Sequence, residues 1–150
     1  MKTWLLFVFI TITIDCMAPV NSLQKQQQEQ EINSILLTIR MLESHNQYNA
    51  KGGSGEYGAY QFTPATWRME CKKRFKKVLS IKDTINQDDV AKAIIIDLIN
   101  KGYSKEQIAS HWNCGSKNFK GKIGVNKYGV SYNVPKYVKE FVKIYKSMLT

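Results

Sequence analysis

The sequence predicts a single α+β domain that is mainly helical, with a small β-like insert after the first core helix. Three observations support this. Several segments carry apolar residues at helical spacing. Glycines gathered at 52–58 and 115–129 separate these segments. A chain of 150 residues with 43% hydrophobic content is sufficient for one core.

The first 22 residues have the features of a secretory signal. Lys2 precedes an apolar run over residues 4–14, which Asp15 interrupts. As a helix this run spans about 16 Å, against a bilayer hydrocarbon core of about 30 Å. Small residues at 20–22 suit a cleavage site. We therefore expect a signal over 1–22, export to the periplasm, cell envelope or extracellular space, and no stable membrane span; an uncleaved N-terminal anchor is the alternative.

A polar lead-in and the first core helix follow. Residues 23–31 are rich in Gln, Lys and Glu, which suits either a short tether or the frayed first turn of a helix. The core helix is expected over about 31–44, with its apolar residues at Ile32, Ile35, Leu36, Ile39 and Leu42. The domain itself is expected over 32–150. Residues 45–62 combine glycines with strand-prone aromatics, which predicts a small irregular β-hairpin or loop.

Two longer helices are expected next. Thr63-Pro64 is typical of an N-cap followed by proline at the first helical position. The acids within residues 86–89 favour the start of the following helix. Its wide apolar face over residues 90–99 suits a central, buried position, and Lys101-Gly102 ends it.

The last third of the chain alternates between helix and loop. Ser104 with Gln107 forms a capping box for a short helix that extends through Trp112. Residues 115–132 contain several glycines and are expected to be loop. Asn133 then starts the final helix, which carries apolar and aromatic residues at core spacing up to residue 149.

The chain has a net charge of +10. Removing the signal takes away one cation and one anion, so the mature part keeps this charge. An anionic partner such as a cell-wall polymer accounts for it, as does a merely solvated basic face. The densest basic run, residues 72–77, lies in no nucleic-acid recognition motif. A nucleic-acid-binding helical protein would also leave the signal unexplained, so no nucleic-acid partner is predicted.

Cys71 and Cys114 remain after signal removal. An even number of cysteines in an oxidising compartment is compatible with a disulfide, and two free buried thiols are the alternative. A zinc site built from these cysteines with His45 and His111 lacks paired Cys-x-x-Cys spacing, so no metal is predicted.

Glu43 lies where the first core helix runs out into the glycine-rich insert. Partial burial raises a carboxyl pKa, and a raised pKa is what the general acid of glycoside cleavage needs. The insert that follows contributes Tyr57, Tyr60 and Gln61 together with glycines that allow close approach of a chain, which suits a sugar cleft. The alternative is an ordinary solvated glutamate.

Four segments in order add to this reading. They are Glu43-Ser44; residues 57–64, Tyr-Gly-Ala-Tyr-Gln-Phe-Thr-Pro; residues 110–115, Ser-His-Trp-Asn-Cys-Gly; and Tyr137-Val138. The set resembles the soluble lytic transglycosylase family of the goose-lysozyme-like superfamily, across nearly the whole mature chain. That family has Ala-Tyr where this chain has His111-Trp112, and often Glu-Thr where it has Asn133-Val134.

The resemblance implies a lysozyme-like fold and cleavage of the β-1,4 bond between N-acetylmuramic acid and N-acetylglucosamine. Glu43 would be the single general acid and base, with a 1,6-anhydro product and no cofactor. Substrate-binding positions would be Ser44, Tyr60, Gln61, Asn113 and Tyr137. For Gln61 a loop-bracing role is the alternative, and Tyr137 also lies on the core stripe of its helix.

Glu56 is a candidate second carboxylate in the insert. Goose-type lysozymes carry an acid in this region, where it can position water, so a muramidase hydrolase is an alternative; a solvated hairpin residue is another reading. A non-catalytic glycan-binding protein on the same scaffold is the remaining alternative. The expected partner is the peptidoglycan glycan strand, with a wall-penetrating assembly in secretion, conjugation or phage entry as a further candidate.

Overall fold

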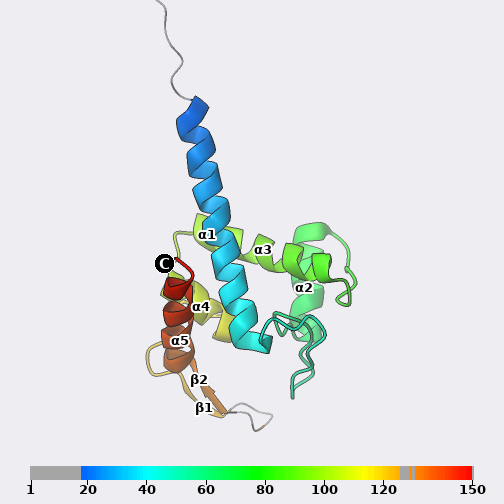
Figure 1. Cartoon of the computed structure of the whole chain (residues 1–150). Helices are drawn as coiled ribbons and strands as arrows, with labels where there is room; N and C mark the ends of the chain where they lie inside the picture. Colours follow the sequence, from blue (N-terminus) through cyan, green and yellow to red (C-terminus); the bar gives the residue numbers. More distant parts are fainter. Residues whose placement is uncertain (1–17, 126–128, 130, 150) are drawn as a thin grey trace, which may run out of the picture.

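The computed structural model describes residues 18–125, 129 and 131–149, and these form a mainly helical α+β domain. Its elements are α1 (Ala18–Ser44), α2 (Pro64–Phe75), α3 (Thr84–Asn100), α4 (Lys105–Cys114), β1 (Ile123–Val125), β2 (Ser131–Asn133) and α5 (Val134–Ser147). Helix α1 packs against α3 and α5, α4 packs against α5, and α2 packs against α3. The insert and the β1–β2 hairpin lie at the end of the molecule where α1 ends (Figure 1). The predicted fold class is confirmed.

The core lies where the C-terminal half of α1 meets α3, α4 and α5. Ile35 and Ile39 of α1, Val90 and Ile95 of α3, and Phe141 of α5 have no solvent exposure. Burying side chains of this kind contributes about 1.5–3 kcal/mol each. This shared core holds the C-terminal end of α1, and with it Glu43, in a defined place.

Helix α1 is longer than the sequence pattern indicated. It begins at Ala18 and includes the whole polar lead-in, residues 23–31. Gln, Lys and Glu are good helix formers, and nothing between residues 23 and 44 breaks the helix. Lys92 pairs with Glu29 and Lys105 with Glu31, while residues 22–30 are exposed and project beyond the other helices (Figure 1).

Of the predicted signal, residues 1–17 lie outside the described part of the chain. Within the described part, no helix combines the length and the apolar character needed to cross a bilayer.

The predicted helix starts at Thr63, Ser104 and Asn133 are confirmed, each with its side chain accepting a backbone N–H bond. The predicted start of α3 at residues 86–89 is wrong. The N-cap is Asp83, whose carboxylate accepts bonds from the backbone N–H groups of Ile85 and Asn86. The helix begins at Thr84, before the acids that were expected to open it, and the side-chain cap of Asp83 starts it.

The insert is an irregular loop, as expected, with isolated bridges that pair Tyr57 with Lys51 and with Phe62. The stretch 115–132 differs from the expected loop because it contains β1, which pairs with β2 in an antiparallel ribbon. Strands of three residues are too short to leave an alternating pattern in the sequence. Helix α4 also runs two residues past Trp112 to Cys114, and its C-cap is Gly115, whose φ of 70° is left-handed.

Candidate active site

A cleft of about 1360 Å³ opens at the end of α1. Its walls come from that helix end, the insert, α2, α4, the β1–β2 hairpin and the first turns of α5. Pockets for single small ligands commonly measure about 300–1,000 Å³. A cleft of this size, open to solvent, suits a polymer segment better than one small molecule.

Glu43 lines this cleft and is partly buried. It is the last residue but one of α1. Tyr137 of α5 donates its hydroxyl to Glu43 Oε1 at 2.6 Å. Burial raises the pKa of Glu43 to about 7, the Tyr137 bond opposes that rise, and the nearby charge of Glu56 adds to it. Near neutral pH the carboxyl is therefore present in both proton-donating and proton-accepting forms.

Tyr137 is itself held as a neutral donor. Burial, together with the charge of Glu43, raises the pKa of Tyr137 well above its ordinary value. The phenol therefore keeps its proton at any pH at which Glu43 titrates. Tyr137 points towards the acid, and its hydroxyl holds one of the two carboxyl oxygens of Glu43.

Glu56 and Gln61 face the same cleft from the insert. Glu56 is half-buried and accepts a bond from the backbone N–H of Ser54 at 2.9 Å. Gln61 has a left-handed φ of 50°, and its Nε2 donates to the Gly58 carbonyl at 2.8 Å. A Cβ on Gly52 would lie 2.5 Å from Gln61 Oε1, so a glycine there lets both polar side chains gather around the loop backbone.

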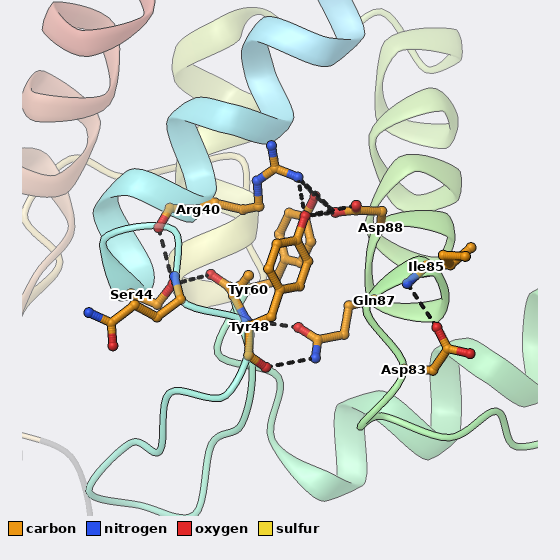
Figure 2. A network of polar contacts seen from close by, with 10 residues as sticks. Arg40, Ser44, Tyr48, Tyr60, Asp83, Ile85, Gln87 and Asp88 are labelled. Carbon is orange, nitrogen blue, oxygen red and sulfur yellow. Dashed lines mark hydrogen bonds and ion pairs between the residues drawn. The ribbon is translucent and has the colours of Figure 1, made fainter.

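Ser44 and Tyr60 lie behind the cleft surface. Ser44 is buried and donates to the Ala59 carbonyl at 2.9 Å, which ties the end of α1 to the insert (Figure 2). Tyr60 is 1% exposed, and its hydroxyl donates to Asp88 at 2.6 Å. Although Tyr60 has atoms in the cleft lining, these contacts give both side chains a role in holding the wall of the site.

Asn113 is exposed on α4 and lines the cleft. Its neighbour Trp112 packs its ring against Tyr60 and Phe62, with ring centroids 5.8 and 5.5 Å apart. The tryptophan therefore joins α4 to the insert, and the amide next to it is left facing solvent.

A polar network that the sequence reasoning missed anchors the insert (Figure 2). Arg40 donates to Asp88 at 2.9 Å and to the Tyr48 hydroxyl at 2.5 Å, and Tyr48 donates to Asp88 Oδ2 at 2.8 Å. Gln87, with no exposure, accepts from the Ala59 N–H at 2.8 Å and donates to the carbonyls of Tyr48 and Ile81. The bonds that join α3 to α1 and to the insert link residues 28 to 48 positions apart, and the only signal was a polar residue at an otherwise buried helix position.

The candidate disulfide is absent: Cys71 and Cys114 are both free thiols. Cys71 is a fully buried residue of α2, whereas Cys114 Sγ contacts Ser110, the Ser116 carbonyl and Lys122 Nζ. The two thiols thus belong to different surroundings. Among residues 18–125, 129 and 131–149, no group of three or more His, Cys, Asp and Glu side chains is arranged to hold a metal ion.

Comparisons with known proteins bear on this arrangement. The family model described as Transglycosylase SLT domain matches residues 21–133, which is most of the chain. The X-ray structure of an inactive Glu-to-Gln mutant of lytic transglycosylase Slt from Pseudomonas aeruginosa is similar in fold, with a TM-score of 0.55 and 17% identity. The match covers 89% of this chain and 25% of that one. The search of curated proteins gives no match. On the extent of the family match, the chain belongs to the transglycosylase SLT domain family, a family of peptidoglycan-cleaving enzymes.

Proposed function

We propose that this protein is an exported lytic transglycosylase that cleaves the β-1,4 bond between N-acetylmuramic acid and N-acetylglucosamine. The observation that carries the proposal is the state of Glu43. It stands in an open cleft with a pKa of about 7 and a fixed hydrogen bond from Tyr137. A carboxyl in this state can donate a proton in one step and accept one in the next.

In the first step Glu43 donates its proton to the glycosidic oxygen, and the bond from that oxygen to C1 of the muramic acid breaks. Positive charge develops on C1, where the substrate's own N-acetyl group stabilises it. Tyr137 stabilises the carboxylate left on Glu43 through the 2.6 Å bond. The leaving group departs as a free 4-hydroxyl.

In the second step the carboxylate of Glu43 takes the proton from the 6-hydroxyl of the same muramic acid. The freed oxygen attacks C1 and closes the 1,6-anhydro ring. Glu43 ends the cycle protonated, as it began, and no water is consumed. One carboxyl therefore suffices for both steps, with Gln61 of the insert and Asn113 of α4 proposed to hold the substrate.

The position of Glu56 supports a second candidate, a muramidase hydrolase. Glu56 is half-buried in the same cleft, and its charge raises the pKa of Glu43. A second carboxylate near the first can orient a water molecule onto C1, which would give a reducing end instead of an anhydro end. The two reactions share Glu43 and differ in the nucleophile.

Export fits the proposed substrate. The apolar run over residues 4–14 suits a secretory signal, and a net charge of +10 suits an anionic cell wall. Expression of the full chain followed by N-terminal sequencing of the secreted product tests this part. A mature protein that begins at Leu23 is expected, and retention of the intact chain in the cytoplasm would contradict it.

One experiment tests the activity. Purified peptidoglycan is digested with the protein and with the Glu43→Gln variant, and the products are identified by mass spectrometry. Anhydro ends from the parent support the transglycosylase and reducing ends the hydrolase. Loss of a general acid lowers the rate by about 10²–10⁴-fold, so the variant should be nearly inactive.

The Glu56→Gln variant is the matched control for charge within the cleft. If Glu56 orients water, this variant shifts the products from reducing towards anhydro ends. Equal cleavage by the parent and by Glu43→Gln would contradict an enzymatic role for Glu43. Glycan binding without cleavage by either protein would identify a non-catalytic binding protein. The inactivity of the Glu-to-Gln mutant of the structurally similar Slt supports a glutamate-dependent reaction on this fold.

A further inference from the structure

The β1–β2 hairpin forms a wall of the cleft, although none of the motif segments includes it. Every residue of both strands lines the cleft: Ile123, Gly124, Val125, Ser131, Tyr132 and Asn133. The hairpin is joined directly to α5, the helix that carries Tyr137. Asn133 caps α5, and the Val134 N–H donates to the Lys122 carbonyl at 3.0 Å. Its position is therefore coupled to that of Tyr137, one turn into α5.

The hairpin leaves its large side chains uncovered. Ile123 and Val125 are each 62% exposed, and Tyr132 is 42% exposed. A two-stranded ribbon is marginally stable by itself, and one with a purely structural role would turn such side chains into the core. Here they stand at the rim of an open cleft, so they are available to a ligand that occupies it.

The ring of Tyr132 is held in a defined place. Tyr132 pairs directly with Gly124 across the ribbon, so the two share one face. A Cβ on Gly124 would lie 3.0 Å from the Tyr132 hydroxyl oxygen and 3.2 Å from Cζ. The phenol therefore lies across the bare glycine backbone. A ring seated in this way loses little further freedom when a ligand packs on it.

We propose that Tyr132 is a glycan-binding residue, which packs its ring against the C–H face of a sugar in the strand bound next to Glu43. An aromatic ring with a polar tip matches a pyranose, which has an apolar face and hydroxyls at its edge. We assign a sugar as the ligand because the hairpin and Glu43 line the same cleft. The inference rests on the proposed function, because the same glycan strand is the substrate there.

Binding is measured with glycan oligosaccharides freed of their stem peptides, and in parallel with ones that still carry them, in the Glu43→Gln background, so that nothing is cleaved. Tyr132→Ala should weaken binding about fivefold to tenfold, as expected for loss of one aromatic contact. Tyr132→Phe keeps the ring and should bind within about twofold of its parent. Ile85→Ala, which removes a 68% exposed side chain of α3 outside the cleft lining, is the control and should not change binding.

Kinetics with Glu43 intact give a second measurement. Tyr132→Ala should raise KM by the same factor and leave kcat within about twofold, since the ring touches a sugar and not the reacting atoms. Thermal melting of each variant checks that the fold is kept.

Unchanged binding by Tyr132→Ala would overturn the proposal, even if the protein cleaves peptidoglycan. Weaker binding only to glycan that still carries stem peptides would overturn the assignment to sugar, as would the absence of any glycan binding. If the parent binds glycan through Tyr132 but does not cleave it, the inference holds and the proposed enzymatic function fails.

Discussion

At the scale of single residues, the proton on Glu43 is set by opposing neighbours. Burial and the charge of Glu56 favour the neutral acid, while the bond from Tyr137 favours the carboxylate. The net result is a pKa of about 7. Because proton donation requires the neutral form, activity should fall as the pH rises through this value.

Two variants should shift the alkaline side of the profile of kcat/KM against pH in opposite directions. Tyr137→Phe removes the bond that lowers the pKa of Glu43, so the limb of the kcat/KM profile should move to higher pH. Glu56→Gln removes a charge that raises the same pKa, so the limb should move to lower pH. Profiles of kcat/KM against pH for the parent and both variants measure this. Shifts of the same sign in both variants would contradict it.

Glu43 should also make the protein's stability depend on pH. Its pKa rises from 4.5 to about 7 on folding, so the native state holds the proton more tightly. The stability gained from the neutral acid is complete below pH 4.5 and is lost as the pH rises through 7. The loss is at most about 3 kcal/mol, less where solvent reaches the carboxyl.

The Glu43→Gln variant cannot ionise, and its amide oxygen can still accept the Tyr137 bond. Urea unfolding at pH 5 and pH 8 should therefore show a smaller decrease in the free energy of unfolding for the variant than for the parent. An equal decrease in both proteins would mean that Glu43 is not the group responsible.

At the scale of elements, side chains of two helices anchor the insert. Ser44 ties it to α1, and Gln87 and Asp88 tie it to α3 (Figure 2). The insert carries Glu56 and Gln61 into the cleft. Contacts outside the cleft thus decide where two cleft side chains lie.

Loss of the Gln87 amide should release the insert. Gln87→Leu keeps the volume but leaves the Ala59 N–H and two carbonyls without their partner, at a cost of about 3 kcal/mol in the free energy of unfolding. Asp89→Ala, an exposed change two residues further along α3, should cost less than about 0.5 kcal/mol. Urea unfolding of both variants measures the difference. Equal stability would contradict an anchoring role.

Within the insert, two adjacent glycines make a matched pair. Gly52→Ala places a Cβ against the side chains of Glu56 and Gln61, whereas Gly53→Ala meets nothing within 4 Å. Besides two side-chain ends, the new Cβ would lie 2.9 Å from the Cβ of Glu56, which is fixed to the backbone, so the first variant should also shift the loop and lose some stability. It should lose about tenfold or more in kcat/KM, since displacement of positioning groups is costly. Gly53→Ala should resemble the parent, and similar activity in both variants would contradict this role for the loop.

At the scale of the whole molecule, noncovalent packing holds the fold without a bridge between Cys71 and Cys114. In the signal-free protein, Cys114 is partly exposed and should react with iodoacetamide in the native state, while fully buried Cys71 should react only after unfolding. A reductant should leave Tm unchanged. Mass spectrometry of the labelled protein and melting with and without reductant measure this. A Tm lowered by the reductant would reveal a bridge.

Much of the secondary structure could be predicted because its signals are local. Thr63, Ser104 and Asn133 cap helices through bonds to residues three positions away, so the sequence alone contains both partners. The same locality places Glu43 at the end of a packed helix. The start of α3 was misplaced by one turn because acids at 86–89 and Asp83 suit the same role. The three-residue strands were missed because they are shorter than any detectable period.

The sequence by itself therefore determined the helices, the interrupted insert and the position of a carboxyl at a helix end. Only the tertiary structure decided what surrounds that carboxyl. Tyr137 reaches Glu43 from 94 residues further along the chain, and Gln87 holds the insert from a different helix. The tertiary structure also places the two free thiols, Cys71 and Cys114, in separate surroundings. The physical reason is that burial and hydrogen bonds between distant residues, which set a pKa and shape a cleft, arise only when the helices pack.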